Sequence, residues 1–362
     1  MAGEETYAVI IAGGQGTRFW PKSRQKRPKQ LLNIVGDGSL IQQTKVRIEK
    51  LIPQENILIV TGTQYGMQIR EHIPGIKHDH ILEEPRGRNT AAALCLASIH
   101  LLTYSKDATM IALPADHCIT QEARFIHHLE MARYFARKNK CLVTLGITPT
   151  HPETGYGYIM KGGKVSGAQK EAFWVNKFTE KPGHEDAKKF VESDNYLWNS
   201  GMFIWEVTTF WQKVQELMPD YYQWFDSLKQ RIGTPSYNEF LDKVYYNIGS
   251  ISVDVGIMER AEQVIVIPVD IGWNDVGSWT ALDQLSEHDK DGNSARATHM
   301  LIDTHNTLID SADKEKLVAM IGIDDLIVVD TKDVLLLCHK NRAQDIRKIV
   351  QDLETRELRE YL

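Results

Sequence analysis

The sequence has few of the features that mark membrane proteins and nucleic-acid-binding proteins. None of its apolar runs approaches the length of a membrane-spanning helix, and the amino terminus is acidic and polar, without an apolar signal region. The net charge of −6 gives no general attraction to nucleic acid or to anionic membranes. These absences predict a cytoplasmic protein with neither a nucleic-acid nor a membrane partner.

Signs of thiol, zinc or covalent chemistry are also scarce. The cysteines, Cys95, Cys118, Cys141 and Cys338, are scattered, and no close pair suggests a zinc or redox site. Most are expected to be small core residues. The chain has no Gly-x-Ser-x-Gly elbow. Catalysis by positioning and charge neutralisation, as in nucleotidyl transfer, is therefore favoured over a covalent enzyme intermediate.

The length and the periodicity of the chain predict an α/β protein with two domains. At 362 residues the chain exceeds the size at which one hydrophobic core stops growing. From residue 7 to about 146, apolar strand-like runs alternate with amphipathic helical stretches, which predicts a largely parallel sheet with helices on both faces. Residues 155–269 predict the second half of the same sheet, with insertions. The strands are expected at 7–11, 57–60, 110–113, 142–145, 157–160, 173–178, 202–207 and 264–269.

A polar, turn-rich break at residues 286–293 separates this region from a β-rich segment. Short apolar runs at 307–309, 317–321, 326–329 and 334–337 predict a small sheet or a few coils of a β-helix, and a charged helical tail follows. The predicted domains are residues 1–287 and 288–362.

A glycine-rich loop, GGQGTRFWP at residues 13–21, follows the first predicted strand. Glycines let the backbone approach phosphate and present its N–H groups as donors, and Arg18 and Lys29 add positive charge. A P-loop would have Gly-Lys-Ser/Thr after the last glycine, and a dinucleotide fingerprint would have glycine where Phe19 stands. A polyphosphate ligand is the favoured interpretation, and an ordinary glycine-rich turn is the alternative.

Two aspartates follow predicted strands of the sheet. Asp116 ends the run 110–116, and Asp275 lies in a Gly- and Trp-framed loop after the strand at 264–269. Ligands bind at the carboxyl ends of such strands, and Mg²⁺ takes one or two carboxylates together with water and substrate phosphates. The pair is a candidate magnesium site. Taken alone, Asp116 is better explained as a turn or helix-capping residue.

Three further segments suit a phosphorylated sugar or a nucleobase. Glu180 and Lys181 end a strand, where an ammonium suits a monoester phosphate and a carboxylate suits sugar hydroxyls. Asn199 and the loop around Gly157 offer an amide and close backbone approach, although each is also compatible with a simple turn. Residues 83–90 lead into a helix and could edge a nucleobase, or could simply cap that helix.

Taken together, seven motifs occur in one order along the chain. They are GGQGTRFWP (13–21), PKQ (28–30), EPRGRNTA (84–91), PADH (114–117), FTEKP (178–182), WNSGMF (198–203) and WNDVGSW (273–279). In this order they resemble the sugar-1-phosphate nucleotidyltransferases, and specifically the bacterial mannose-1-phosphate guanylyltransferases. The resemblance implies a Rossmann-like domain with a mixed, mostly parallel sheet. It also implies a small C-terminal left-handed β-helix that supports a homodimer and ends in a helix.

The resemblance implies the reaction of GTP with mannose 1-phosphate to give GDP-mannose and pyrophosphate, by in-line attack with Mg²⁺. Arg18 and Lys29 would neutralise the triphosphate, and Asp116 and Asp275 would hold the metal. The residues implied for the nucleotide are Ala12, Gly13, Gly14, Gly16 and Thr17, with Arg88 and Asn89 at the guanine edge. Those implied for the sugar phosphate are Gly157, Glu180, Lys181 and Asn199.

Departures from the family pattern are mild, such as Phe19 and Lys22 where leucine is common. The long family form carries a fused isomerase domain, which is not expected here. Another sugar 1-phosphate, such as a mannoheptose 1-phosphate, is an alternative substrate. A non-catalytic regulatory paralogue is a further alternative, but such proteins tend to lose the loop cations or the metal aspartates, and all four residues are present.

Overall fold

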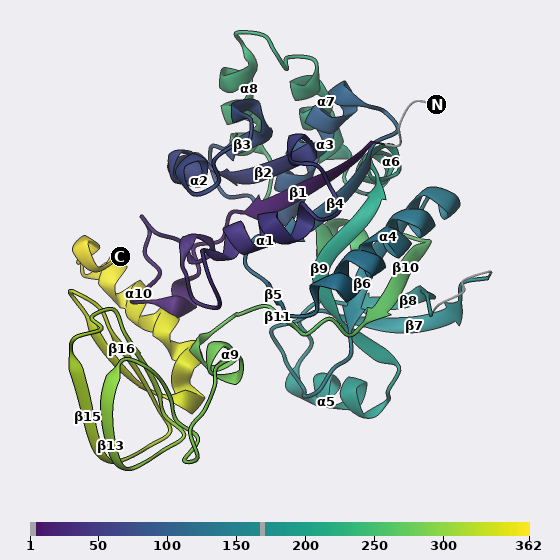
Figure 1. Ribbon diagram of the computed structural model, residues 1–362. Helices are drawn as coiled ribbons and strands as arrows, with labels where there is room; N and C mark the ends of the chain where they lie inside the picture. Colours follow the sequence, from purple (N-terminus) through teal and green to yellow (C-terminus); the bar gives the residue numbers. More distant parts are fainter. Residues whose placement is uncertain (1–4, 167–170) are drawn as a thin grey trace. The chain divides into compact units, whose positions relative to one another are not determined.

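The computed structural model describes residues 5–166 and 171–362, which form two compact units (Figure 1). The first unit comprises the described residues of Met1–Gly13, Thr44–Ala115 and Ile119–Trp273. The second comprises Gly14–Gln43, Asp116–Cys118 and Asn274–Leu362. Packing therefore assembles each unit from separate segments, whereas the sequence predicts two contiguous domains, whose boundary at residue 287 stays a prediction.

A mixed sheet forms the centre of the first unit. Within the described residues it has nine strands in the order β3-β2-β1-β4-β9-β6-β10-β8-β7. The pairings from β3 to β4 and between β6 and β10 are parallel, and the other pairings are antiparallel. The strands are β1 (Thr6–Ala12), β2 (Ile57–Gly62), β3 (Ile81–Glu84), β4 (Thr109–Pro114), β6 (Leu142–Ile147), β7 (Tyr158–Lys164), β8 (Phe173–Thr179), β9 (Tyr196–Glu206) and β10 (Val264–Val269). This mixed sheet confirms the predicted α/β fold class, but parallel pairings do not predominate among the described strands, so the sheet is not mostly parallel as expected.

Both faces of the sheet are buried. On β1, Tyr7 and Val9 pack into the same core cluster as helix α3, while the alternate residues Ala8 and Ile10 are equally buried on the opposite face. Helix α3 is buried almost all round because it packs against the sheet and against α6 and α7. Helix α4 packs against β6, β9 and β10. The helices are α1 (Leu40–Ile48, which starts in the second unit), α2 (Gly66–His72), α3 (Asn89–Tyr104), α4 (Glu122–Asn139), α5 (His184–Glu192), α6 (Val207–Leu217), α7 (Pro219–Lys229) and α8 (Tyr237–Asn247).

Strand β9 is longer than predicted. The sequence predicts a strand at 202–207 and offers a turn for the preceding WNSG residues, but β9 runs from Tyr196 to Glu206 through them. Gly201 adopts φ 69°, and the register against β6 shifts between Thr144 and Gly146. The glycine therefore marks a β-bulge inside a strand, and the turn interpretation is wrong.

The second unit contains stacked parallel strands. Ser294 pairs with Leu308 and Leu308 pairs with Ile327, so successive passes of the chain lie in register. The strands β12, β14, β16 and β17 form one sheet and β13 and β15 another, which confirms a β-helix-like region. Helix α10 follows the strands. The elements are α9 (Trp279–Gln284), β12 (Ser294–Arg296), β13 (Thr298–His305), β14 (Leu308–Ser311), β15 (Leu317–Asp324), β16 (Leu326–Asp330), β17 (Leu335–His339) and α10 (Ile346–Thr355). The chain passes between the units within β5 (Cys118–Ile119) and β11 (Trp273–Asn274).

Two sequence expectations concern hydrophobic segments and thiols. Among the described residues, no helix has the length and apolar character needed to cross a bilayer. Cys95, Cys118 and Cys141 are buried, as expected of small core residues, and Cys338 is partly exposed.

Candidate active site

The glycine loop belongs to the second unit, and Gly16 determines its path. Gly16 adopts φ 68°, and a Cβ at this position would lie 2.3 Å from Cβ of Lys29. A larger residue would therefore be strained and would collide with the lysine. The carbonyl of Gly16 also accepts a hydrogen bond of 2.6 Å from the Ser23 hydroxyl. The tight turn places the backbone of Gly16 against Lys29, and Thr17 and Arg18 follow directly in a short 3₁₀ turn.

Lys29 connects the loop to the two predicted metal ligands. Its side chain is buried, and Nζ donates to Oδ2 of Asp116 at 2.7 Å and to the backbone carbonyl of Asp275 at 2.8 Å. Burial raises the pKa of the Asp116 carboxyl, but the Lys29 ammonium, His117 and hydrogen bonds to the carboxylate together hold that pKa below its ordinary value. The structure thus brings together Lys29, Asp116 and Asp275, which are far apart in sequence.

Asp116 and Asp275 offer two carboxylates, which are ligands suited to a hard divalent cation. Asp116 is ionised beside Lys29, and the carboxylate of Asp275 accepts from the Gly277 amide at 3.0 Å. Among residues 5–166 and 171–362, no cluster of three or more His, Cys, Asp or Glu side chains is placed to hold a metal. Two carboxylates together with phosphate oxygens and water are a suitable set for Mg²⁺.

The four predicted sugar-phosphate residues lie together in the first unit. A Cβ at Gly157 would lie 2.6 Å from Oε2 of Glu180 and 3.3 Å from Cβ of Asn199. The backbone N–H of Asn199 donates to the backbone carbonyl of Gly157 at 2.8 Å. Lys181 Nζ pairs with Oε1 of Glu180 at 2.6 Å. The missing side chain at Gly157 therefore leaves room for the Glu180 carboxylate beside Asn199.

Lys181 is held in an unusual backbone conformation. Its φ is 46°, a left-handed value that costs energy for a residue with a side chain. The preceding residue is fixed because the Glu180 amide donates to Oε1 of Glu259 at 2.8 Å. The Lys181 side chain is 61% exposed. This conformation places an ammonium in solvent beside Glu180.

Arg88 and Asn89, predicted at the guanine edge, lie at the start of α3. Arg88 donates through Nε to the Tyr245 carbonyl at 2.7 Å and through Nη2 to the Tyr246 carbonyl at 3.4 Å. Asn89 has φ 66°, and its Oδ1 accepts from the Thr90 amide at 2.8 Å. Arg88 thus fastens α3 to the end of α8, and Asn89 remains exposed.

Comparison with known proteins identifies the family. The Nucleotidyl transferase family model matches residues 7–292, and that of the MannoseP isomerase/GMP-like beta-helix domain matches residues 297–353. The chain belongs to the nucleotidyl transferase family. It is therefore an enzyme of the nucleotidyltransferase class.

The similarity of this nucleotidyl transferase to individual relatives extends over the whole chain. It is 36% identical to mannose-1-phosphate guanylyltransferase 2 of Escherichia coli O157:H7, over 100% of this chain and 76% of that protein. It is 35% identical to mannose-1-phosphate guanylyltransferase of Salmonella muenchen, over 98% of this chain and 74% of that protein. A crystal structure described as a mannose-1-phosphate geranyltransferase from Thermus thermophilus superposes with a TM-score of 0.86 and 31% identity, covering 97% of this chain and 99% of that one. The resemblance drawn from the seven motifs is confirmed.

The sequence analysis missed a segment of the nucleotidyl transferase that links its first-unit residues. Asp254 accepts from Asn199 Nδ2 at 2.7 Å, Glu259 accepts from the Glu180 amide at 2.8 Å, and the Val253 amide donates to Thr90 Oγ1 at 2.9 Å. Burial, and then the nearby Glu180 charge, raise the pKa of Asp254 to about 6. The available signal was the sequence SVDVGIME (252–259), in which two carboxylates flank an apolar run.

Glu84 is a second buried carboxylate that the site assignment omitted. It ends β3, its Oε1 accepts from the Tyr245 hydroxyl at 3.1 Å, and its Oε2 would lie 3.7 Å from a Cβ on Gly13. Burial raises the pKa of Glu84 to about 7, although the Tyr245 hydrogen bond opposes this. Near neutral pH the group therefore exchanges a proton beside Ala12 and Gly13, where β1 ends.

The raised pKa of Glu84 predicts a pH-dependent stability. Folded Glu84 keeps its proton up to about pH 7, whereas an unfolded glutamate loses it near 4.5, so stability falls as pH rises through this window. Glu84→Gln cannot ionise. Relative to the parent, its free energy of unfolding is expected to increase by up to ~3 kcal/mol between pH 4 and pH 8. Urea denaturation at both pH values measures this difference, and an equal difference at the two pH values would contradict the assignment.

Proposed function

We propose that this enzyme transfers GMP from GTP to α-D-mannose 1-phosphate, giving GDP-mannose and pyrophosphate. The observation that carries the proposal is the Lys29–Asp116–Asp275 cluster beside the glycine loop, in a chain similar over its whole length to named mannose-1-phosphate guanylyltransferases. The names of the guanylyltransferases and of the Thermus thermophilus structure share mannose 1-phosphate, which supports that acceptor.

In the proposed reaction, a phosphate oxygen of mannose 1-phosphate attacks the α-phosphorus of GTP in line. One P–O bond forms to the sugar phosphate, the bond to the β-phosphate oxygen breaks, and pyrophosphate leaves. Arg18 and Lys29 neutralise the triphosphate and the charge that grows on the leaving group. Backbone N–H groups from Ala12 to Thr17 line the phosphates. Such catalysis depends on positioning and charge, in agreement with the lack of a nucleophile elbow.

Asp116 and Asp275 are the residues proposed to hold Mg²⁺. When bound, the ion supplies charge neutralisation on the phosphates of the nucleotide. Before it binds, Lys29 satisfies the Asp116 carboxylate. The lysine thus keeps this carboxylate ionised and in place. Removing the two charged groups from water costs free energy, and the attraction within the ion pair offsets that cost.

The residues around Gly157 are proposed to bind mannose 1-phosphate. Lys181 contacts the phosphate, and Glu180, Asn199 and the Gly157 backbone contact the hexose hydroxyls. Asp254 orients the Asn199 amide, and Glu259 fixes the backbone before Lys181. Arg88 and Asn89 are proposed at the guanine edge.

Substrate specificity tests the proposal. Pyrophosphate release is measured with GTP, ATP, UTP and dTTP against a panel of sugar 1-phosphates that includes mannoheptose 1-phosphate. GTP with mannose 1-phosphate is expected to exceed every other pair in kcat/KM. A site that hydrogen-bonds the polar groups of one substrate leaves its own polar groups unpaired when another substrate binds. A mannoheptose 1-phosphate as the best acceptor would replace mannose, and no turnover of any pair would favour a regulatory paralogue.

A homodimer is proposed through an exposed apolar face of the β-helix-like region. Met300 and Ile302 on β13 and Leu317 and Ile321 on β15 are 53–70% exposed, and Ile302 pairs directly with Ile321. Exposed apolar patches on soluble proteins mark association surfaces.

Charge on this face is expected to dissociate the dimer. Ile321→Lys buries an unpaired charge in the proposed contact, so light scattering after gel filtration should show the mass of a monomer. Val46→Lys is the matched control, since Val46 is 56% exposed on α1 and belongs to the first unit. Equal masses for the parent and Ile321→Lys would place the association surface elsewhere.

A further inference from the structure

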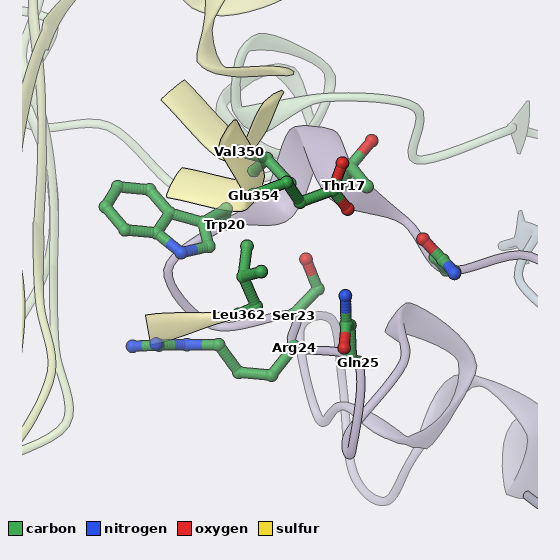
Figure 2. Close-up of a pocket in the computed structure, with 9 residues that line it drawn as sticks. Thr17, Trp20, Ser23, Arg24, Gln25, Val350, Glu354 and Leu362 are labelled. Carbon is green, nitrogen blue, oxygen red and sulfur yellow. The ribbon is translucent and has the colours of Figure 1, made fainter. Parts of the chain in front are cut away.

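The last residues of the chain contact the glycine loop within the second unit. The backbone carbonyl of Tyr361 accepts two hydrogen bonds, one from Trp20 Nε1 at 2.7 Å and one from Arg24 Nη1 at 2.6 Å. Figure 2 shows Leu362 lying among Trp20, Ser23 and Arg24. The cavity that remains there is about 20 Å³, which is room for roughly one water molecule, so the segment is closely seated.

Several further contacts hold the loop side of this contact in place. Trp20 is 7% exposed, its backbone carbonyl accepts from Trp279 Nε1 at 3.2 Å, and Arg24 lies over its indole ring at 5.7 Å. Arg24 also donates from Nε to the Pro21 carbonyl at 2.6 Å and from Nη2 to Asp333 at 3.0 Å. Arg24 therefore ties its own loop, the β16–β17 connection and Tyr361 together.

A second attachment fixes the chain that follows the glycine loop to the stacked strands. Asp310 of β14 is almost completely buried and pairs with both Lys22 and Arg296. Arg296 also donates to the carbonyl of Ile34, just beyond the loop. The backbone from Lys22 to Ile34, which includes Lys29, is thus anchored at points on either side of the lysine.

We propose that Tyr361, through its carbonyl, and Arg24 are positioning residues that hold the glycine loop in its nucleotide-binding conformation. The inference rests on the proposed function for the identity of the nucleotide. Arg18 is on this loop and Lys29 follows it, and a loop ordered before binding does not lose that conformational freedom when the triphosphate binds. The tail contact and nucleoside triphosphate binding are therefore coupled, with each favouring the other.

Three variants test the coupling. Arg24→Met keeps the side-chain stem, Trp20→Phe keeps an aromatic ring without its N–H, and a third lacks Tyr361 and Leu362. Arg342→Met is the matched control, because Arg342 pairs with Asp345 in the same unit and makes no recorded contact with the described residues of the loop. Each test variant loses at least one hydrogen bond to the Tyr361 carbonyl. A hydrogen bond of about 1 kcal/mol changes the equilibrium between the ordered and the open loop by about fivefold.

The expected result is a rise of about fivefold or more in KM for GTP in each test variant, with KM for mannose 1-phosphate changed less than about twofold. Tryptic cleavage after the exposed Lys26 should accelerate by a similar factor, and saturating GTP should slow it again. Arg342→Met should match the parent in both measurements.

Cleavage needs no turnover, so it separates this inference from the proposed reaction. If the parent showed no transferase activity but the variants were cleaved faster and GTP protected them, the positioning role would be supported and the proposed transfer reaction would be contradicted. Parental cleavage rates and an unchanged KM for GTP in Arg24→Met and Trp20→Phe would overturn the positioning role, as would an equal rise in both KM values. If removal of Tyr361 and Leu362 unfolds the protein, the two point variants decide.

Discussion

Asp116→Asn and Asp275→Asn are each expected to lower kcat at least about a hundredfold, equivalent to ~3 kcal/mol of transition-state stabilisation. Asparagine has nearly the same shape as aspartate but lacks the charge that a divalent cation would require of its ligands. In Asp116→Asn the Lys29 ammonium also loses its partner at 2.7 Å. Steady-state pyrophosphate release at saturating GTP, mannose 1-phosphate and Mg²⁺ measures the effect.

Asp330→Asn is the matched control for the two aspartates. Asp330 is buried in the second unit and pairs with Lys316 at 2.7 Å, the same kind of ion pair at the same distance as that of Asp116. Its kcat should stay within about twofold of the parent, because a structural ion pair affects stability more than turnover. Thermal unfolding of all three variants verifies that the fold survives. A near-parental rate in Asp116→Asn or Asp275→Asn would remove that residue from the metal site.

Lys181→Ala and Arg18→Ala are expected to have separable effects of about tenfold or more, since hydrogen bonds to charged groups contribute ~1.5–3 kcal/mol. Lys181 should act on the sugar phosphate, so its loss should raise KM for mannose 1-phosphate and leave KM for GTP nearly unchanged. Arg18 should act as charge develops on pyrophosphate, so its loss should lower kcat with every sugar tested.

Lys177→Ala controls for the loss of a nearby lysine, because Lys177 is exposed on β8, the strand that ends just before Glu180 and Lys181. Replacing Lys181 by alanine leaves the left-handed backbone of φ 46° as unfavourable as before, so lost charge accounts for the kinetic change. The assignment fails if Lys181→Ala weakens GTP binding as much as it weakens mannose 1-phosphate binding.

Local sequence patterns predicted most strands of the sheet, although not β3, because burial on both faces produces continuous apolar runs. The core strands β2, β4, β6 and β10 lie where these runs occur. β9 was misplaced at its start, since the pattern of residues 198–201 is equally compatible with a turn, and only pairing with β6 and β7 fixes it as strand. Tertiary contacts therefore decide where local propensity is balanced.

The candidate site was predicted in part because motifs identify side chains and not their partners. The sequence placed Glu180 and Asn199 in one site, and their neighbour Gly157 with them. It omitted Asp254 and Glu259, whose importance depends on burial and on contacts 55 and 79 residues away. The contact of Tyr361 with Trp20 spans 341 residues, and no local pattern signals it. Such partners become visible only when the folded chain brings them together.

The position of the transferred phosphorus tests the central claim most directly. The enzyme is incubated with mannose 1-phosphate and Mg²⁺ and with GTP labelled at either the α- or the γ-phosphorus. The account predicts that the α label appears in GDP-mannose and the γ label in pyrophosphate, in equal amounts. Release of the γ label as orthophosphate, or its transfer to the sugar, would contradict nucleotidyl transfer to mannose 1-phosphate.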